Sequence, residues 1–294
     1  MTTLSPFTVH SAASVEDASD LLERLGEDAI VYCGGTELLL LYKLGLADYA
    51  NLVDIKGIEE LRGIGAEPDE LRIGAAMTHR EIAHSPLVEE HFPALALMER
   101  NVGNVRVRNQ GTIGGNLCFA DPHSDPATFL IAAGGDVTIR RGGGPPRRIP
   151  VEDLIRGPFD TALEPGELLI SVHVPLPRPG SATVHRKMSF SERPAITVAT
   201  QVLVDEGVVR AARIGVGSVG VRPVRATQAE QEIVGQPADE LPDERVAAAS
   251  ASAARAAAPV TDANGSAEYK EHLTGVLTGR CLREAVRTAG QGLL

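Results

Sequence analysis

The glycine-rich stretch Gly111-Thr-Ile-Gly-Gly-Asn116 lies in a longer segment that runs from Asn101 to Ala127, NVGNVRVRNQGTIGGNLCFADPHSDPA. Two adjacent glycines beside Thr112 and Asn116 let backbone amides approach a ligand closely. We expect a turn here whose N–H groups form a concave site for an anion such as a phosphate. Ser124 and Asp125 follow in another turn-prone cluster, where Asp125 could accept hydrogen bonds from ligand hydroxyls. Taken alone, the segment is more typical of an ordinary Gly-Gly turn with a solvated aspartate.

A second stretch, Ile30-Val-Tyr-Cys-Gly34-Gly-Thr-Glu-Leu38, changes that interpretation. An apolar run, two glycines and a hydroxyl residue precede a further apolar run of helical type. A strand, a glycine-rich turn and a helix N-terminus form a phosphate-binding arrangement, since the first helical amides are free. The stretch matches neither the P-loop nor the G-x-G-x-x-G fingerprint. Two unlike phosphate-binding turns predict one extended dinucleotide that spans two lobes.

Composition limits the possible classes of protein. A chain of 294 residues is expected to form one large domain or two ordinary ones. Its net charge of −11 argues against nucleic-acid binding and against strong binding to an anionic membrane. The N-terminal residues lack the basic and apolar regions of a signal peptide, and no apolar run is long enough to span a bilayer. We therefore expect a cytoplasmic protein.

The cysteines and histidines do not predict a metal site. Cys33, Cys118 and Cys281 lie far apart in the sequence. An iron–sulfur cluster needs four thiolates and a structural zinc usually needs several, so we expect neither on this chain. The eight histidines form no tight cluster or H-E-x-x-H motif. Cys33 and Cys118 fall inside the glycine-rich stretches, where we interpret them as small buried side chains.

Periodicity predicts a small parallel α/β lobe that ends near Gly57. Ser14 caps a helix that ends at Gly26. The expected order is strand, helix, strand, helix and strand, over residues 7–10, 15–25, 28–33, 37–44 and 51–55.

The following lobe is expected to be α+β and mostly antiparallel. Strands are predicted at 61–65, 70–74, 137–141, 147–150 and 167–174, and helices after the Thr78–Glu81 capping box, at 93–100 and at 126–133. The segment Pro175-Leu-Pro-Arg-Pro-Gly180 predicts a domain boundary. Beyond it, strands are expected at 197–204 and 208–216, and helices at 241–258 and from Ser266 onward.

The pair of glycine-rich stretches resembles the FAD-binding medium subunit of molybdenum hydroxylases such as carbon monoxide dehydrogenase and xanthine dehydrogenase. The resemblance covers nearly the whole chain. It implies an α+β protein in which residues 1–177 form a two-lobed FAD-binding domain of the PCMH type, with the lobes split near residue 57. Residues 178–294 then form the smaller C-terminal α+β domain of the flavoprotein subunit.

The same resemblance implies the residues that bind the cofactor. The first loop contributes Cys33, Gly34, Gly35, Thr36, Glu37 and Leu38 to the diphosphate. The second contributes Thr112, Gly115 and Asn116, with Ser124 and Asp125 beside the cofactor. Val102 and Gly103 fall where relatives line the isoalloxazine ring, and Leu169 and Lys187 match later flavin neighbours. Several relatives place an aspartate and an aromatic residue shortly after that lysine, where this chain has Pro194 and Ala195.

The implied function is electron transfer within a multi-subunit molybdenum hydroxylase. FAD, bound without a covalent link, would collect electrons and deliver them to an acceptor such as NAD or a quinone. Molybdopterin would reside on a large partner subunit and [2Fe-2S] clusters on a small one, in a dimer of heterotrimers. Because the cofactor performs the redox chemistry, we assign no catalytic acid or base. The alternatives are a self-sufficient FAD oxidase like vanillyl-alcohol oxidase and a non-catalytic module that binds a dinucleotide.

Overall fold

The N-terminal lobe forms as the sequence predicts. In the computed structural model, which describes residues 6–190 and 192–291, the Asp17 amide donates a hydrogen bond to Ser14 Oγ over 3.1 Å. Gly26 ends helix α1 with φ of +60°, a conformation that favours glycine. The lobe contains strands β1 (Thr8–Ser11), β2 (Ala29–Tyr32) and β3 (Asn51–Asp54), helices α1 (Val15–Leu25) and α2 (Leu38–Leu44), and the short 3-10 helix Gly26–Asp28. Its sheet is parallel, in the order β1-β3-β2.

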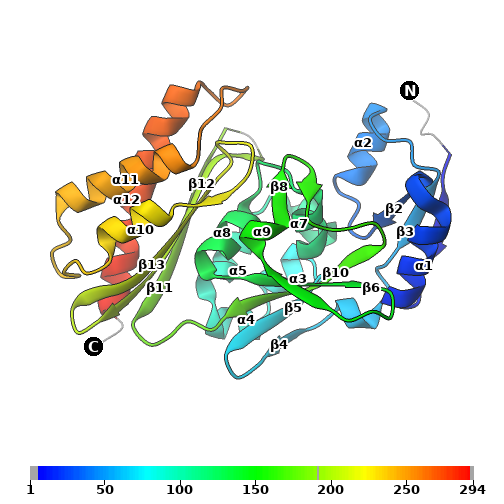
Figure 1. Cartoon of the computed structure of the whole chain (residues 1–294), viewed down its shortest axis with the longest axis horizontal. Helices are drawn as coiled ribbons and strands as arrows, with labels where there is room; N and C mark the ends of the chain where they lie inside the picture. Colours follow the sequence, from blue (N-terminus) through cyan, green and yellow to red (C-terminus); the bar gives the residue numbers. More distant parts are fainter. Residues whose placement is uncertain (1–5, 191, 292–294) are drawn as a thin grey trace.

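The middle lobe is built on an antiparallel sheet with the order β4-β5-β10-β6-β7 (Figure 1). Strand β10 lies at its centre because eight of its positions carry side chains that are at least half-buried, as a central strand requires. The strands are β4 (Ile64–Ala66), β5 (Glu70–Gly74), β6 (Asp136–Arg141), β7 (Arg147–Pro150) and β10 (Glu167–Pro175), and β8 (Ile155–Gly157) pairs with β9 (Asp160–Thr161).

Helices surround this sheet and carry most of the connections. They are α3 (His79–Ala83), α4 (Pro86–His91), α5 (Pro93–Arg100), α6 (Val105–Gln110), α7 (Ile113–Phe119), α8 (Asp125–Ala133), α9 (Val151–Leu154) and the 3-10 helix Glu59–Leu61. The predicted capping box is present, since Thr78 Oγ1 accepts from the Glu81 amide and Glu81 accepts from the Thr78 amide. Leu71, Ile73, Leu95, Phe129 and Val172 lie in the core that these elements enclose.

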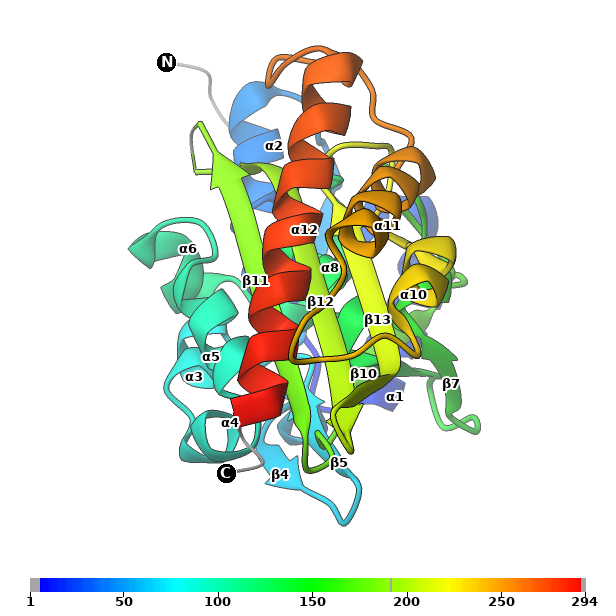
Figure 2. The same cartoon turned by 90° about the vertical axis from the view of Figure 1, so that its left-hand side faces the viewer.

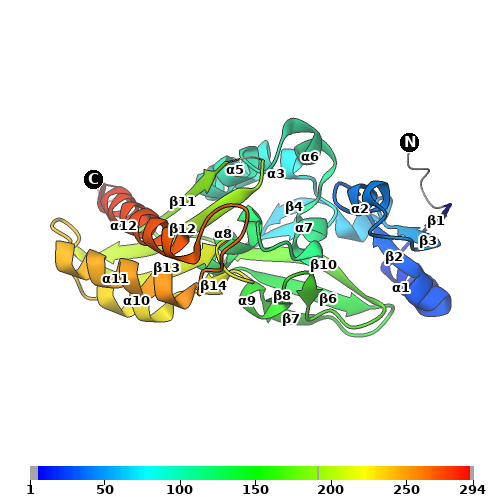
Figure 3. The same ribbon diagram turned by 90° about the horizontal axis from the view of Figure 1, so that it is seen from above.

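The C-terminal domain lies at the opposite end of the molecule from the N-terminal lobe (Figure 3). Its antiparallel sheet has the order β11-β12-β13-β14, with β11 (Ser181–Ser189), β12 (Pro194–Asp205), β13 (Val208–Gly217) and β14 (Val224–Arg225). Helices α10 (Thr227–Ile233), α11 (Asp243–Ala256) and α12 (Ala267–Gln291) cover the outer face of this sheet (Figure 2). None of the helices in the described part of the chain is both long and apolar enough to cross a bilayer.

Helix α8 packs on the inner face of the C-terminal sheet and joins the two domains. Every residue from Asp125 to Ala133 is buried, which is expected for a helix that is apolar on all sides. Its contacts reach β12 and β13 of one domain and α5 and β10 of the other. Inside this junction the hydroxyls of Thr128 and Thr197 form a hydrogen bond with each other over 2.9 Å. The N-terminus of α8 is therefore fixed by both domains.

The expected α+β fold class is confirmed, but the prediction of a turn at Gly114-Gly115 was wrong. Both glycines lie in the first turn of α7. A Cβ on Gly114 would fall 2.7 Å from the Cβ and the carbonyl oxygen of Ala75. Glycine is needed there so that α7 can lie directly against the segment that follows β5. Helices α4, α6 and α7 and strand β11 were not predicted, and Leu61 belongs to a 3-10 helix rather than to a strand.

The tight contact between α8 and β13 makes a prediction about stability. In Gly215→Ala the added Cβ would lie 2.4 Å from the backbone carbonyl oxygen of Thr128, so the junction must shift. We expect the free energy of unfolding to fall by about 1–3 kcal/mol in urea denaturation. Gly57→Ala is the control, because a Cβ there meets nothing within 4 Å and should change stability by less than about 0.5 kcal/mol. Equal stability of the two variants would contradict this description of the junction.

Candidate functional site

The two glycine-rich loops meet in space. A Cβ on Gly34 would lie 2.3 Å from the carbonyl oxygen of Gln110 and 2.8 Å from the Cα of Gly111. On the opposite side of this contact, a Cβ on Gly111 would lie 3.4 Å from Thr36 Oγ1. Because both obstacles at Gly34 are backbone atoms, even a methyl group cannot be accommodated there without moving one loop. The backbone contact brings the loops together into one candidate site.

The first loop presents free backbone amides. Among the residues described, no acceptor is found for the N–H groups from Gly34 to Leu38, and these residues are half-buried. Gly35 has φ of +67°, which favours glycine, and Glu37 caps α2 without a side-chain hydrogen bond. Half-buried amides without acceptors are costly, and a run of them at a helix N-terminus attracts an anion. The loop is therefore the part of the site best suited to a diphosphate.

The second loop offers far fewer amides than the sequence predicts. The amides of Ile113 and Gly114 donate to the carbonyls of Met77 and Ala75, at 3.1 and 2.9 Å. The Gly115 amide donates to Thr112 Oγ1 at 3.1 Å, and the Asn116 amide donates to the Thr112 carbonyl at 2.9 Å. Only the Thr112 amide in this loop has no acceptor in the described chain. This loop is held rigid against the protein and can contact a ligand mainly through side chains.

Asn116 and Ser124 supply those side chains. Ser124 Oγ donates a hydrogen bond to Asn116 Oδ1 over 2.7 Å, so the two groups are paired beside α7 and α8. An amide oxygen that already accepts one hydrogen bond leaves the Asn116 NH₂ group free to donate to a ligand. The sequence-based prediction placed both residues at the cofactor, and the structure brings them together.

Asp125 and Lys187 form a link between the domains. Lys187 Nζ, on β11, donates to Asp125 Oδ2 over 2.8 Å and to the Asn101 carbonyl over 2.6 Å. Asp125 Oδ1 is buried and lacks a hydrogen-bond partner among the described residues. Lys187 therefore fixes the backbone just before Val102, while Asp125 Oδ1 accepts no hydrogen bond within the described chain.

Burial controls the charges in this cluster. Desolvation raises the pKa of Asp125, although the Lys187 ammonium opposes the shift. The neighbouring His185 Nε2 lies 3.6 Å from Asp125 Oδ1. Burial, reinforced by the Lys187 charge, lowers the pKa of His185 to about 3, so this imidazole is neutral at physiological pH. The contact between His185 and Asp125 is thus not an ion pair under those conditions.

The residues expected beside the flavin ring differ in their accessibility. Gly103 has φ of +45°, so Val102 and Gly103 form a turn that needs glycine, and Arg108 Nη1 donates to both of their carbonyls at 2.9 and 3.0 Å. Leu169, in contrast, lies on β10 inside the core and is only 4% exposed. Val102 is 6% exposed and belongs to the same core, so of these three residues only Gly103 is partly accessible to a ligand.

Sequence reasoning missed Arg193, which connects the two domains at the rim of the site. One of its nitrogens lies 2.8 Å from Glu37 Oε2, in the first loop, and the other pairs with Asp121, just after α7. Glu37 and Asp121 lie 156 and 72 residues away along the chain. No local pattern in the sequence could have identified such a contact.

Pro194 and Ala195 stand where the resemblance implies an aspartate and an aromatic residue. Both residues are buried; Ala195 lies in the core of the C-terminal domain, and the Pro194 carbonyl accepts from His123 Nδ1 at 3.0 Å. Neither can cover a flavin. Phe190, at the end of β11, is 59% exposed and belongs to the same connection.

The cysteines near the loops are unreactive. Burial raises the pKa of Cys33, and it raises the pKa of Cys118 to about 12. Because the thiolate is the reactive form, neither side chain is suited to covalent attachment or redox chemistry. Within residues 6–190 and 192–291, no group of three or more His, Cys, Asp and Glu side chains is arranged to hold a metal ion.

These residues fit FAD. The free amides from Gly34 to Leu38 suit its diphosphate. The close backbone contact at Gly34 leaves no space for a side chain at this position. Asp125 Oδ1 is an unpaired acceptor but it is buried, so a ligand hydroxyl reaches it only if neighbouring side chains move.

Comparisons with known proteins indicate the same cofactor. Residues 5–177 match the family described as the FAD binding domain in molybdopterin dehydrogenase, and residues 188–285 match the CO dehydrogenase flavoprotein C-terminal domain. The chain is 32% identical to the carbon monoxide dehydrogenase medium chain of Afipia carboxidovorans, over 95% of this chain and 96% of that one. It is 31% identical to the nicotine 6-hydroxylase medium subunit of Paenarthrobacter nicotinovorans, over 94% and 95%. A structure of carbon monoxide dehydrogenase from Hydrogenophaga pseudoflava superposes with a TM-score of 0.93 at 30% identity, covering 98% of this chain and 99% of that one.

The buried His185 makes a prediction about pH. Its pKa is about 3 in the folded chain, against an ordinary value of 6.5, so folding favours the neutral imidazole. This contribution to stability is complete above pH 6.5 and is lost as the pH falls. Between pH 6.5 and about 3, the free energy of unfolding should fall more steeply than in His185→Gln, by up to about 1.4 kcal/mol per pH unit. Urea titrations across this range measure the difference.

The exposed His272, replaced by glutamine, is the matched control for this titration. Parallel pH curves for His185→Gln and the unmodified chain would show that the imidazole is not buried as described.

Proposed function

The chain belongs to the family of the FAD binding domain in molybdopterin dehydrogenase, and we propose that it is the flavin-carrying subunit of a molybdenum hydroxylase. It is an FAD-dependent oxidoreductase subunit that accepts electrons from the iron–sulfur clusters of a partner and passes them to an external acceptor. The free amides from Gly34 to Leu38, joined by backbone contact to the second loop, are the observation that carries this assignment.

We assign the diphosphate to the first loop. Its ligands are the amides of Gly34, Gly35, Thr36, Glu37 and Leu38, and Cys33 is the residue just before them in the chain. The remaining parts of FAD outside the diphosphate are assigned to the second loop and the start of α8. The residues are Thr112, through its backbone N–H, Asn116, through its side-chain NH₂, and Gly115, Ser124 and Asp125. Val102 and Gly103 line the ring, and Lys187 keeps their backbone in place through the Asn101 carbonyl. Leu169 supports this region from the core.

FAD, when bound, supplies the redox chemistry by taking up electrons singly or in pairs. The protein binds and orients it, and Arg193 closes the rim between Glu37 and Asp121. Binding is non-covalent in this proposal, because the thiols of Cys33 and Cys118 are held in their protonated, unreactive form.

The partners follow from the family. Medium subunits of this kind act with a large subunit that carries the molybdenum cofactor and a small subunit that carries [2Fe-2S] clusters. We propose a dimer of such heterotrimers, a cytoplasmic location, and domain limits of 1–177, with lobes split near 57, and 178–294. The end of β10 at Pro175 and the start of β11 at Ser181 support the domain limits. The relatives named above are subunits of multi-subunit enzymes, which favours this function over a self-sufficient oxidase or a non-catalytic module.

The backbone contact at Gly34 predicts the effect of one methyl group on FAD affinity. In Gly34→Ala the new Cβ displaces the first loop from Gln110, so the free amides no longer face the rest of the site. Loss of one hydrogen bond to a charged group weakens binding by about ten- to a hundredfold. Flavin fluorescence titration of the apoprotein measures this change. Gly65→Ala is the control, because a Cβ there meets nothing within 4 Å. Wild-type FAD affinity in a folded Gly34→Ala protein would rule out the site as drawn.

Dependence on partners separates this function from a self-sufficient oxidase. The isolated FAD-loaded chain should be reduced by dithionite and should not be reduced by any substrate of the native complex. Adding the molybdenum and iron–sulfur subunits should restore substrate-dependent bleaching of the flavin under anaerobic conditions. Bleaching by substrate without partners or metals would instead support the oxidase.

A further inference from the structure

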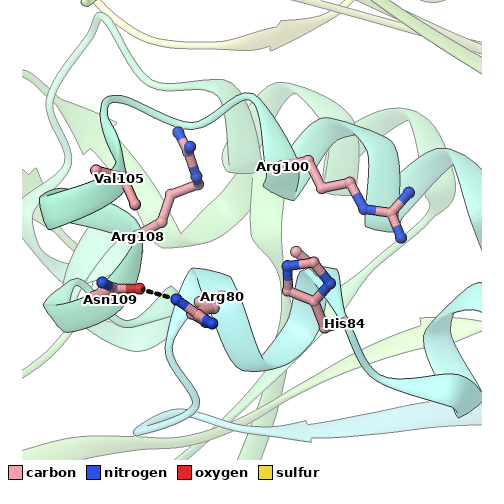
Figure 4. A pocket seen from close by; sticks show the side chains of 7 residues that line it. Arg80, His84, Arg100, Val105, Arg108 and Asn109 are labelled. Carbon is pink, nitrogen blue, oxygen red and sulfur yellow. Dashed lines mark hydrogen bonds between the residues drawn. The ribbon is translucent and has the colours of Figure 1, made fainter.

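A cavity of about 190 Å³ lies between helices α3, α5 and α6, outside the candidate cofactor site. It is lined by Arg80, His84, Arg100, Val105, Arg108 and Asn109 (Figure 4). One buried water needs only roughly 15 Å³, so the cavity can hold a polyatomic ligand. Three guanidinium groups gather around it in a chain whose net charge is −11. Such a concentration of positive charge is not explained by the composition.

The charge of Arg100 is compensated, whereas the charges of Arg80 and Arg108 are not. Arg100 pairs with Glu89 and turns toward that carboxylate. No carboxylate of the described residues lies within 4 Å of the guanidinium nitrogens of Arg80 or Arg108, whose protein partners are all neutral oxygens. Two uncompensated cations therefore lie at one cavity.

Both side chains are also held in place. Arg80 Nη1 donates to Asn109 Oδ1 over 3.2 Å, which ties α3 to α6 (Figure 4). Arg108 donates through Nη1 alone to the Val102 and Gly103 carbonyls. A guanidinium has five donors, so each group keeps several for a ligand. Arg108, which makes two part-buried hydrogen bonds, is the better preorganised of the two for binding an anion.

We propose that this cavity binds a phosphate-bearing small molecule, with Arg80 and Arg108 as its principal ligands. Forked guanidinium donors match the oxygen geometry of phosphate, and Val105 and Ala83 complete the lining of the cavity. Free phosphate or pyrophosphate and the phosphates of a nucleotide share this chemistry. Arg108 also holds the Val102–Gly103 turn, so the cavity shares one residue with the segment that we assign to the flavin ring.

Isothermal titration of the full chain, saturated with FAD so that the cofactor loops are occupied, tests the proposal at low ionic strength. The probes are inorganic pyrophosphate and ADP. We expect Arg80→Gln and Arg108→Gln each to weaken pyrophosphate binding by about tenfold or more. Arg106→Gln removes the same charge from the exposed surface of α6 without touching the cavity, and should change affinity by less than about twofold.

The outcomes separate the possibilities. Tighter binding of ADP than of pyrophosphate would identify a nucleotide as the ligand, and the reverse would identify a free phosphate anion; either result supports the cavity. No detectable pyrophosphate binding, unchanged binding in Arg80→Gln, or an equal loss in Arg106→Gln would overturn the proposal. Arg80→Gln leaves the Val102–Gly103 turn untouched, so it remains informative if Arg108→Gln disturbs the fold. If the chain takes up no FAD, the titration is repeated on the purified chain, and only the affinity lost in Arg80→Gln relative to Arg106→Gln is assigned to the cavity.

Discussion

A backbone amide that is shielded from water needs an acceptor, and the amides from Gly34 to Leu38, on half-buried residues, find none within the described chain. This requirement accounts for the organisation of the site. The strand β2 delivers the chain to the loop, Gly35 turns it at φ of +67°, and α2 begins without a side-chain cap. Each feature leaves backbone N–H groups of this loop without an acceptor in the protein. In the function that we propose, the diphosphate of FAD supplies the missing acceptors.

The rest of the fold holds this donor run opposite a rigid counterpart. In the second loop, nearly all backbone N–H groups donate to Ala75, Met77 or the loop's own helix cap. The loop is therefore rigid and is not a second phosphate-binding site. Helix α8, buried from end to end, carries Asp125 to that loop from the junction of the domains. From the C-terminal domain, Arg193 reaches Glu37 in the first loop, and Lys187 reaches Asp125 and the Asn101 carbonyl. The C-terminal domain thus completes the site instead of standing apart from it.

Local signals in the sequence predicted most of the fold. The Ser14 cap, the Gly26 stop and the Thr78–Glu81 capping box act over a few residues, so each was identified from its neighbours. The Gly114-Gly115 pair was misassigned because the reason for glycine is a close contact with Ala75, which lies on another segment. The roles of Lys187 and Arg193 depend on pairings far apart in the chain. For the same reason, no sequence pattern shows that Leu169 faces the core or that Arg80 and Arg108 share a cavity.

Amide hydrogen exchange of the chain with FAD and with riboflavin tests the central claim most directly, because riboflavin has the same ring but no phosphate. Saturation with FAD should slow exchange across Gly34–Leu38, where the described chain offers no acceptors, while riboflavin should leave that segment unchanged. Both ligands should affect the segment around Val102 and Gly103. Unaltered exchange from Gly34 to Leu38 in the FAD-saturated protein would contradict the assignment of the diphosphate to these amides.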